Sequence, residues 1–480
     1  MPSWCRFRLL VAEDWALCKK SLTNFRDQSF GLLMLPRNVN IILLAISVSL
    51  LCYSTVARAK KAILVGEALD MIDQFYVDPV DNRSLLEAAM TGITSQLDEN
   101  SEFIPPALFG AFQDVIDQEF AGIGILVEQP EKAKPVRVIT PLAGSPAIAA
   151  GLLPGDEILK VNGEDVSTME IGEVSNRLRG PVGTELTVSI KRKAGTEEDK
   201  NLDIKLSRRT IEIESVLGDH RDESNRWVFR LREHPEIAYA RLTGFGEKTV
   251  VELKQVLETL NSDFDSLILD VRANSGGLLD AAVDVCDDFL DAGRIVTIKR
   301  RGGEIESEYD ATQGVLVRGD IPMVVLIDGN SASASEIVAA CLQDYKRATI
   351  VGSRSFGKGT VQSVLQLDNG RSALKLTTAR YYRPNGRNIH RLANAKPEDE
   401  WGVSPNEGMD VAISDDDYKA IIQLWQKASF PVISGANPAT EASGNPGSAV
   451  DPQLKRAIEV LRKNKGQDDT ETHAEARKAA

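Results

Sequence analysis

The chain has 480 residues, a net charge of −14 and a sequence pI near 5.0, so it is long enough for roughly two or three domains with cores of their own. No basic cluster accompanies this acidic balance, which argues against nucleic acid as a partner. The five cysteines show neither a disulfide framework nor metal-ligand spacing. We therefore expect no metal site. No cofactor is expected either.

The first sixty residues contain an apolar run at 39–57, preceded by Arg37 and followed by Arg58. Its length lies between that of a signal-peptide core and that of a spanning helix. We expect residues 1–60 to be an N-terminal extension with a membrane anchor or signal peptide, and an uncleaved anchor is favoured. Either form would export the rest of the chain. Met34 is an alternative start to Met1, so the true start stays open.

Residues 61–118 have an apolar stripe at helical spacing, with Ile63, Leu69 and Phe75 among its members, and Asp78-Pro79 interrupts it. This pattern predicts a helical region. Residues 119–209 are rich in strand and turn signals, and residues 208–311 alternate between strand and helix patterns. An α/β fold with several domains follows from this order of elements.

A glycine pair, Gly276-Gly277, follows the apolar run 267–269 and precedes a helical pattern over 281–290. Glycine has no side chain, so backbone N–H groups here can approach a ligand closely. A tight turn between strand and helix is the ordinary interpretation of the same residues. Both interpretations stay open on this segment alone.

The segment Ser331-Ala-Ser333-Ala-Ser335-Glu336 follows a predicted buried strand at 321–327 and a turn at 328–330. Apolar residues at helical spacing come next, so Ser333 is predicted at a helix N-terminus, where free N–H groups favour negative charge. Ser333 to Glu336 also fits a capping box, which would make Ser333 only a helix cap. Spacing alone does not choose among the three serines as a nucleophile.

Lys358 lies 25 positions (358 − 333) after Ser333, between two glycines. A buried lysine loses its ammonium form more easily, so it can take the proton of a serine. Residues 352–360 nearly match the phosphate-binding loop motif, but Gly359 occupies the position where that motif has a Ser or Thr that binds magnesium. Residues 360–367 alternate between polar and apolar side chains, which indicates a strand and not the helix that follows such a loop. An NTPase is therefore disfavoured. If the strand starts near Lys358, Gln362 would share a strand face with it, since four is an even step.

Histidine offers the competing mechanism, a Ser-His-Asp triad. The chain has four histidines, and nothing in their surroundings favours or excludes this use; they are His220, His234, His390 and His473.

From about residue 64 to 405 the chain resembles the carboxyl-terminal processing proteases, which are Ser-Lys peptidases. The resemblance implies Ser333 as nucleophile, Lys358 as base and Gln362 as the residue that orients the lysine. It also implies an oxyanion hole from the N–H groups of Gly277 and Ala334. A supporting aspartate of the family matches Asp344, which is eleven positions (344 − 333) and roughly 16 Å along a helix from Ser333, so we expect it to be structural.

Residues 119–209 resemble a PDZ domain in the ordered run of Gly-Ile-Gly-Ile, Ala-Gly-Ser-Pro-Ala, Gly-Asp and Asn-Gly motifs. The resemblance implies that Gly122, Ile123, Gly124 and Ile125 bind the carboxylate of a peptide. Protein or peptide substrates with free apolar C-termini would be the partners.

Together the patterns and the resemblance predict a helical N-terminal region (61–118), a PDZ domain (119–209), an α/β serine peptidase domain (210–432), and a linker, short helix and disordered tail (433–480). The family resemblance implies that the peptidase domain is crotonase-like. The expected function is an exported serine endopeptidase of the bacterial envelope, anchored in the inner membrane with its catalytic domain in the periplasm. The alternative is a catalytically inactive PDZ adaptor. The physiological substrate, the effect of the PDZ domain on activity and the number of chains in the assembly stay open.

Overall fold

The protein is described by a computed structural model that covers residues 63–193, 199–261, 263–431 and 451–463, with positions 42, 43, 45, 46 and 49. It divides into a unit of residues 1–89 and a unit of residues 90–480. No helix among these described residues is long and apolar enough to cross a membrane. Apart from those five positions, the expected anchor or signal at 39–57 lies outside the described residues, as do the extension before it, the linker at 433–450 and the tail after 463.

The predicted helical region is broken where Asp78-Pro79 indicated. Residues 63–75 are helical, and α3 (Asn82–Thr94) begins after the break. Asp81 caps α3, because its carboxylate accepts from the N–H groups of Arg83 at 3.1 Å and Ser84 at 3.3 Å. The region is not wholly helical, however. A short strand, β1 (Glu102–Ile104), precedes α4 (Pro106–Asp117). It forms a strand by pairing with residues 373–375, which lie far along the chain.

The peptidase-like part is built on a five-stranded sheet whose last four strands are parallel. Its strands, in spatial order, are β10 (Val216–Leu217), β13 (Ile237–Leu242), β14 (Ser266–Asp270), β17 (Met323–Ile327) and β18 (Thr349–Gly352). The parallel strands are apolar because helices cover the sheet. The connecting helices are α7 (Glu247–Leu260), α8 (Leu279–Asp287) and α9 (Ala334–Asp344).

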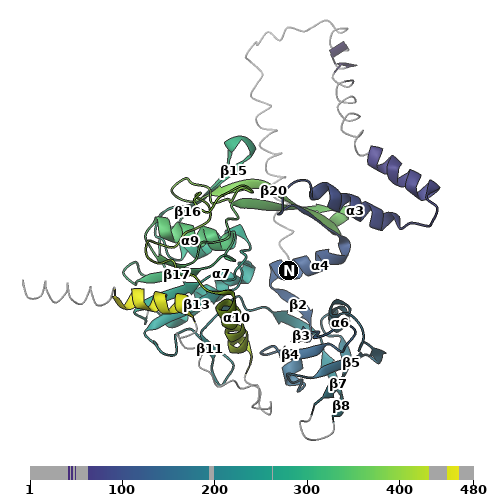
Figure 1. The fold of residues 1–480 in the computed structure, drawn as a ribbon, viewed down its shortest axis with the longest axis horizontal. Coiled ribbons are helices and arrows are strands. Elements are labelled where there is room, and N and C mark those ends of the chain that lie inside the picture. The colour runs from purple at the N-terminus through teal and green to yellow at the C-terminus, as the bar shows by residue number, and fades with distance from the viewer. Residues whose placement is uncertain are drawn as a thin grey trace, which may run out of the picture. The chain divides into compact units, whose positions relative to one another are not determined.

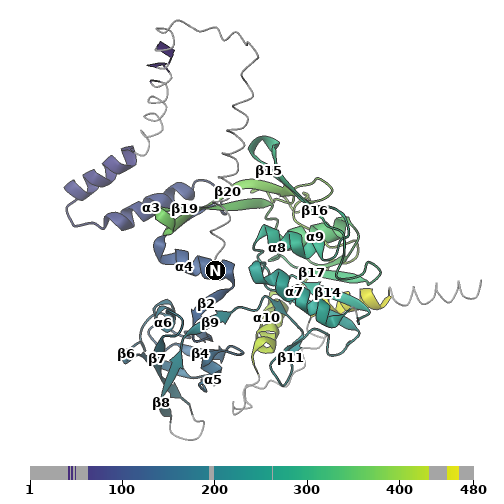
Figure 2. The same cartoon turned by 180° about the vertical axis from the view of Figure 1, so that it is seen from behind.

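The sheet separates two apolar cores. Leu267 and Leu269 of β14 pack into the core under α7, α8 and α9, whereas Ile268 between them faces the other side. Figures 1 and 2 show these helices against one face of the sheet. On the other face the C-terminal helix, residues 452–463, buries Ile458 and Leu461 against the strands. The short helix was predicted, but its place in the peptidase core was not.

A buried ion cluster fastens this C-terminal helix. The guanidinium of Arg272 donates to Asp270 and to Asp451, with N–O distances of 2.6 and 2.9 Å, and both partners are buried. The ring of Trp425, from α10 (Asp415–Ser429), lies 5.0 Å from the same guanidinium. Because a buried cation must be paired, Asp451 is part of the packing and not of a loose tail.

A second, antiparallel sheet stands beside the first. It contains β1, β15 (Gly293–Arg300), β16 (Ile305–Ala311), β19 (Thr360–Leu367) and β20 (Ser372–Tyr382). The predicted strand at 360–367 is therefore confirmed as β19. Two short helical turns and one further strand pair complete this part: η2 (Arg301–Gly303), η3 (Asp368–Gly370), β11 (His220–Arg221) and β12 (Trp227–Val228).

The PDZ-like part has a sheet and core of its own. Strand β2 (Glu119–Gly122) pairs with β9 (Arg209–Glu212) where the chain enters and leaves it. Its other elements are β3 (Ile125–Glu128), β4 (Arg137–Pro141), α5 (Pro146–Ala149), β5 (Glu157–Val161), β6 (Glu164–Asp165), α6 (Ile171–Leu178), β7 (Glu185–Arg192) and β8 (Lys200–Ser207).

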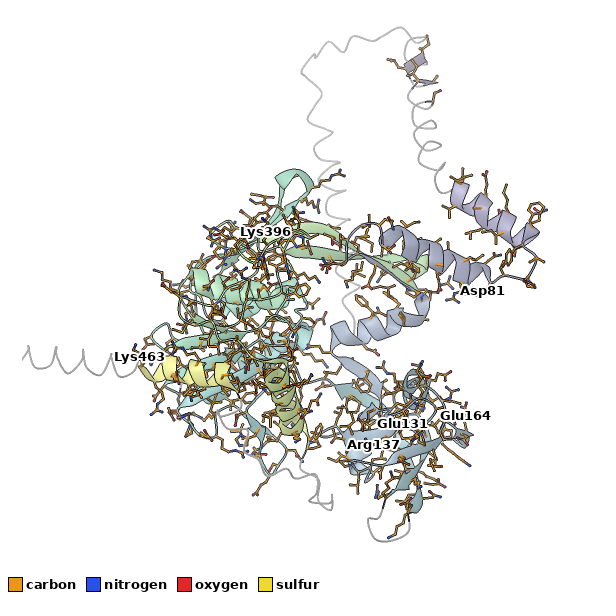
Figure 3. All side chains as sticks on the ribbon, in the orientation of Figure 1. Asp81, Glu131, Arg137, Glu164, Lys396 and Lys463 are labelled. Atoms are coloured by element: carbon orange, nitrogen blue, oxygen red, sulfur yellow. The ribbon has the colours of Figure 1, made fainter. Side chains whose placement is uncertain are left out.

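Charged side chains cover the outside of this part, with Glu131 and Glu164 exposed (Figure 3). Glu164 pairs with Arg177 at 2.8 Å, and such exposed pairs contribute about 1 kcal/mol or less. The stability of the PDZ-like part therefore depends on its apolar core.

Candidate active site

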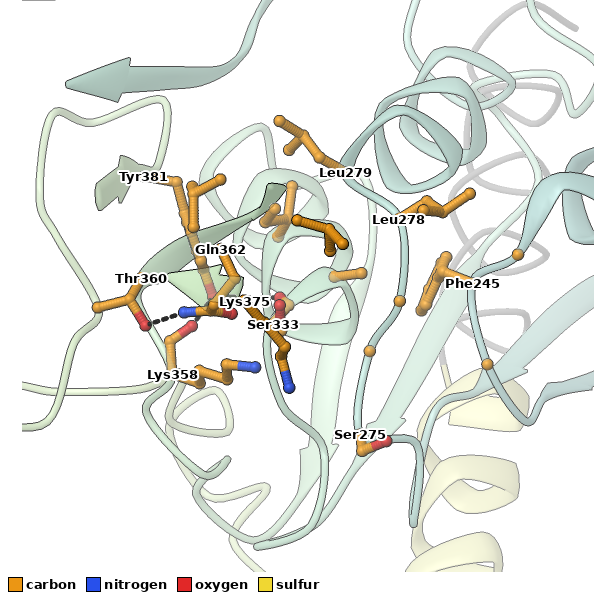
Figure 4. A pocket seen from close by; sticks show the side chains of 18 of the residues that line it. Phe245, Ser275, Leu278, Leu279, Ser333, Lys358, Thr360, Gln362, Lys375 and Tyr381 are labelled. Atoms are coloured by element: carbon orange, nitrogen blue, oxygen red, sulfur yellow. Dashed lines mark hydrogen bonds between the residues drawn. The ribbon is translucent and has the colours of Figure 1, made fainter. Parts of the chain in front are cut away.

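A cleft of about 400 Å³ brings together the residues that the two sequence motifs supplied. Ser333, Lys358 and Gln362 all line it, as do Gly277 and Ala334. Figure 4 shows the side chains of Ser333 and Lys358 directed toward the same space. The cleft is therefore the candidate active site.

Ser333 occupies a strained turn between β17 and α9. Its φ of 56° and ψ of −114° lie outside the ordinary regions for a residue with a side chain. The Ser333 side chain makes no capping hydrogen bond. Strain of this kind is retained where the surroundings enforce it, often at functional sites. The interpretation of Ser333 as only a helix cap is not supported.

The two neighbouring serines have structural partners instead. Ser331 is fully buried, and its hydroxyl donates to the Val271 carbonyl at 2.8 Å. Ser335 is also fully buried and donates to the Asn274 carbonyl at 2.9 Å. Of the three serines that spacing left open, only Ser333 lines the cleft.

The glycine pair packs directly against the serine turn. A Cβ on Gly276 would lie 2.7 Å from the Cβ of Ser333, and one on Gly277 would lie 2.0 Å from the carbonyl oxygen of Phe245. Both positions therefore require glycine. The N–H groups of Gly277 and Ala334 donate to no acceptor within the part of the chain that the structure describes. Two free donors at a helix N-terminus suit a developing oxyanion.

Lys358 is half-buried, and its side-chain amino group has no hydrogen-bond or ion-pair partner among the described residues. Burial lowers the pKa of Lys358, and the nearby cation of Lys375 lowers it further. Lys375 lines the same cleft, but its amino group is already engaged, because it donates to Glu102 at 2.7 Å. Lys358 is thus the lysine better suited to act as a neutral base.

Gln362 is held by two threonines. Its amide nitrogen donates to the hydroxyl of Thr360 at 2.9 Å and to that of Thr377 at 3.2 Å. The strand β19 begins at Thr360, so Lys358 precedes it and the condition for a strand face shared with Gln362 is not met. Gln362 still lines the cleft, and its carbonyl oxygen accepts no hydrogen bond from the described residues.

Glu336 has a role that the sequence did not reveal. It is fully buried, and its carboxylate accepts from the N–H groups of Ser333 at 2.8 Å, Gly357 at 2.7 Å and Lys358 at 2.8 Å. The hydroxyl of Ser355 donates to it at 2.5 Å. Burial raises the pKa of Glu336, whereas these four hydrogen bonds oppose that rise. The capping-box pattern was the only signal for this residue, and it gave no hint of the lysine segment.

Comparisons with known proteins identify the family. A model of peptidase family S41 matches residues 236–406, and a PDZ domain model matches residues 137–192. A solved photosystem II D1 C-terminal processing protease is 28% identical, with a TM-score of 0.40, over 73% of this chain and 92% of that one. The carboxyl-terminal-processing protease of Synechocystis sp. is 33% identical over 70% of this chain and 73% of its own length. The carboxy-terminal-processing protease of Bartonella bacilliformis is 34% identical over 414 residues, which cover 83% of this chain and 87% of that relative. The chain belongs to the carboxy-terminal-processing proteases of peptidase family S41.

The protein is therefore a serine-type peptidase with a PDZ domain, as the sequence predicted. Its relatives favour this function over that of an inactive PDZ adaptor. A phosphate-binding loop is also disfavoured, because the strand β19, and not a helix, follows Lys358.

Asp344 lies at the far end of α9 and does not line the peptidase cleft. It binds Arg383 through two hydrogen bonds of 2.6 and 2.9 Å, and the side chain of Asn385 donates to it at 3.0 Å. The residue thus fixes the loop after β20, which agrees with the structural role expected for it.

The described histidines of the peptidase do not line the cleft. His220 forms a hydrogen bond of 2.8 Å with Asp219 on the short strand β11, and His234 pairs with Glu236 at 3.3 Å. His390 packs its backbone against Gly359, and burial lowers its pKa. His473 lies outside the described residues. Among the described residues, no histidine lines the cleft where it could complete a triad with Ser333.

In the PDZ domain, the Gly122–Ile125 segment runs from the last residue of β2 to the first residue of β3, and β3 is an edge strand of its sheet. The N–H groups of Ile123 and Gly124 have no acceptor in the described part of the chain. A Cβ on Gly124 would lie 2.4 Å from the Cβ of Ser145, so the segment is packed closely against the start of α5. An open edge beside free N–H groups is the arrangement that strand addition needs.

If Lys358 is the base, the pH dependence of the peptidase follows from the environment of this lysine. Because its pKa is lowered, kcat/KM should rise with pH and level off below the 10.5 of an ordinary lysine. Lys375→Gln removes a neighbouring cation, so the pKa of Lys358 should rise. The rising limb of the profile of kcat/KM against pH should therefore move to higher pH. A pH profile of kcat/KM on a peptide substrate measures both, with His390→Gln as the control that leaves the limb in place. A limb lost in His390→Gln would contradict the assignment of the base.

Proposed function

We propose that this protein is an exported endopeptidase that cleaves proteins near their C-termini through an acyl-enzyme on Ser333. One observation carries the proposal: of three candidate serines, Ser333 alone faces the cleft, and it does so beside Lys358 and two free N–H groups. The chemistry is that of an activated serine whose base is a lysine with a lowered pKa.

In the first step the Oγ of Ser333 attacks the substrate carbonyl while its proton passes to the neutral amino group of Lys358. The carbonyl oxygen becomes an oxyanion and accepts hydrogen bonds from the N–H groups of Gly277 and Ala334. The intermediate then collapses, the C–N bond breaks, and Lys358 returns the proton to the leaving amine. Water, deprotonated by the same lysine, hydrolyses the ester and restores Ser333.

Gln362 would orient the base. Its nitrogen is occupied by Thr360 and Thr377, so its unpaired carbonyl oxygen is the end available to the Lys358 amino group. Ser333 and Lys358 do not share a hydrogen bond in this structure, so substrate binding has to bring them together. Asp344 would support activity only through the loop that it fixes.

We propose residues 119–209 as the PDZ domain and 210–432 as the peptidase domain, to which the helix at 452–463 also belongs through its burial on the sheet. The PDZ domain would add a substrate C-terminus to the open edge of β3, with the carboxylate held by the N–H groups of residues 122–125. Substrates with apolar C-termini suit this site.

We further propose that the peptidase works in the periplasm of a bacterial cell, held at the inner membrane by the apolar run at 39–57. The basic residues on both sides of that run and its position ahead of the first helix support an N-terminal anchor. The proposal leaves the number of chains in the active assembly open.

The dyad is tested by substitution. Ser333→Ala and Lys358→Ala should each abolish peptide cleavage, and the double variant should be no worse, because both residues act as one unit. Steady-state cleavage and circular dichroism measure activity and folding. Ser331→Ala and Ser335→Ala serve as matched controls that retain activity in the folded fraction, although each leaves buried partners without a hydrogen bond, at about 1–3 kcal/mol for each such group. Wild-type cleavage by Ser333→Ala would rule out this nucleophile.

Carboxylate capture is tested on full-length Ser333→Ala, which binds without cleaving. A peptide with a free apolar C-terminus should bind, and its amidated form should bind roughly tenfold more weakly because the charge-assisted hydrogen bonds are lost. Gly124→Ala, whose Cβ would collide with Ser145, should abolish the difference, whereas Gly144→Ala meets open space and should keep it. Equal affinity of free and amidated peptide for the parent protein would exclude the carboxylate site.

The anchor is tested by fractionating cells and mapping the N-terminus of the native protein. The protein should stay with the membranes in high salt, leave them in detergent, and retain residues 39–57. A soluble periplasmic product that begins near Lys60 would show cleavage instead of anchoring. A mature peptide from residues 1–33 would establish Met1, and not Met34, as the start.

A further inference from the structure

The Lys358 segment is held on two sides. Glu336 binds the N–H side of the segment, as described above. On the carbonyl side, the hydroxyl of Tyr381 lies within hydrogen-bonding distance of the Lys358 carbonyl oxygen and 3.1 Å from the Ser333 carbonyl oxygen. One fully buried phenol on β20 thus contacts the backbone of both proposed catalytic residues.

A hydroxyl has a single hydrogen to donate, so the two carbonyls do not depend on it equally. The Ser333 carbonyl already accepts from the N–H groups of Glu336 at 2.9 Å and Ile337 at 3.0 Å. The Lys358 carbonyl accepts from no other donor in the described part of the chain. The hydrogen of Tyr381 is therefore needed by Lys358.

We propose that Tyr381 is a positioning residue for the peptidase reaction, whose hydroxyl holds the Lys358 carbonyl and thereby keeps the lysine side chain in the cleft beside Ser333. The inference rests on the proposed function, because it assumes that Ser333 and Lys358 carry out the chemistry. It assigns to Tyr381 no contact with the substrate carbonyl.

The location of Tyr381 suits this role. Its ring packs in the core under α7, α8 and α9, and its own N–H donates to the Gly359 carbonyl at 3.2 Å, so β20 fixes the phenol against the lysine segment. Burial, together with the charge of Glu336, raises the pKa of Tyr381 well above its ordinary value. The phenol consequently remains a donor in alkaline solution, where the lysine base is neutral.

The charges that face Lys358 come from four elements. They are Lys375 on β20, Glu336 on α9, Glu102 on β1, and Asp98 in the turn before β1. Tyr381→Phe removes the phenol oxygen and leaves all four of these charged side chains in the chain. If the segment loosens, Lys358 becomes more exposed, and the burial that lowers its pKa is reduced. The loss of the hydroxyl should therefore move the alkaline limb of kcat/KM to higher pH.

The test compares Tyr381→Phe with Tyr382→Phe. Tyr382 is the next residue on the same strand, and its ring stacks on Lys299 at 4.4 Å instead of facing the cleft. For Tyr381→Phe we expect kcat to fall by roughly tenfold to a hundredfold, as for a displaced catalytic group, with KM within about twofold. Tyr382→Phe should match the wild type in kcat, KM and pH profile.

Labelling of Ser333 by a fluorophosphonate separates positioning from folding. Each labelling time course is scaled to its own end point, which gives the fraction of sites that can be labelled. The rate constant then refers to the folded sites alone, even if part of the preparation is unfolded. Tyr381→Phe should label more slowly per site. A normal rate per site, a kcat equal to that of Tyr382→Phe, or an effect on KM alone would each overturn the proposal.

Ser333→Ala, assayed in parallel, distinguishes this inference from the function beneath it. If Ser333→Ala is inactive and Tyr381→Phe behaves like the wild type, only the role of Tyr381 fails. If Ser333→Ala cleaves normally, the dyad itself fails.

Discussion

The candidate active site depends on the buried carboxylate of Glu336. It accepts from Ser333 in the turn after β17 and from Ser355, Gly357 and Lys358 in the segment after β18. Burying a carboxylate costs several kcal/mol unless hydrogen bonds offset the loss of water, and here four donors do so. Because those donors come from two separate segments, the stabilisation of the charge requires both segments to be in place. Without Glu336 the serine turn and the lysine segment would have no shared polar partner on their N–H sides.

The parallel sheet explains why the segments meet at all. Strands β14, β17 and β18 are neighbours in that order, and each is followed by one part of the site: the glycine pair, then Ser333, then Lys358. The carboxyl ends of parallel strands meet at one edge, where α/β proteins bind ligands. The loops are also joined to one another, since the Asp328 carboxylate accepts from the Ala273 N–H at 3.0 Å and the Asn274 carbonyl accepts from the Ala332 N–H at 3.0 Å. The packing of Gly276 against Ser333 then leaves no room for a side chain.

The sequence predicted what is local and missed what depends on distant partners. The strand before Ser333, the helix after it and the strand at 360–367 follow from apolar periodicity and turn residues, and the structure contains all three. The choice of Ser333 over Ser331 and Ser335 needed the fold, because only burial and hydrogen bonds show that the outer serines are occupied. The sequence did not distinguish Tyr381 from an ordinary aromatic residue of the core. It likewise did not distinguish Glu336 from an ordinary residue of a helix cap. The strand β1 was also missed, since three residues form a strand only when β20 lies beside them.

The far face of the sheet is tied to the site by the same kind of buried charge. Asp270 ends β14, and it accepts from Arg272 and from the hydroxyl of Tyr239 at 2.9 Å. Arg272 is thereby fixed two residues past the strand, at the start of the loop that leads to Gly277, and Asp451 of the C-terminal segment binds its remaining side. Removing Asp451 would take away one of the two buried carboxylates that bind Arg272 and leave Asp270 as its single carboxylate partner at this loop. The C-terminal helix therefore does more than cover apolar strands, because the ion cluster at its first residues supports the backbone from which the proposed oxyanion donor extends.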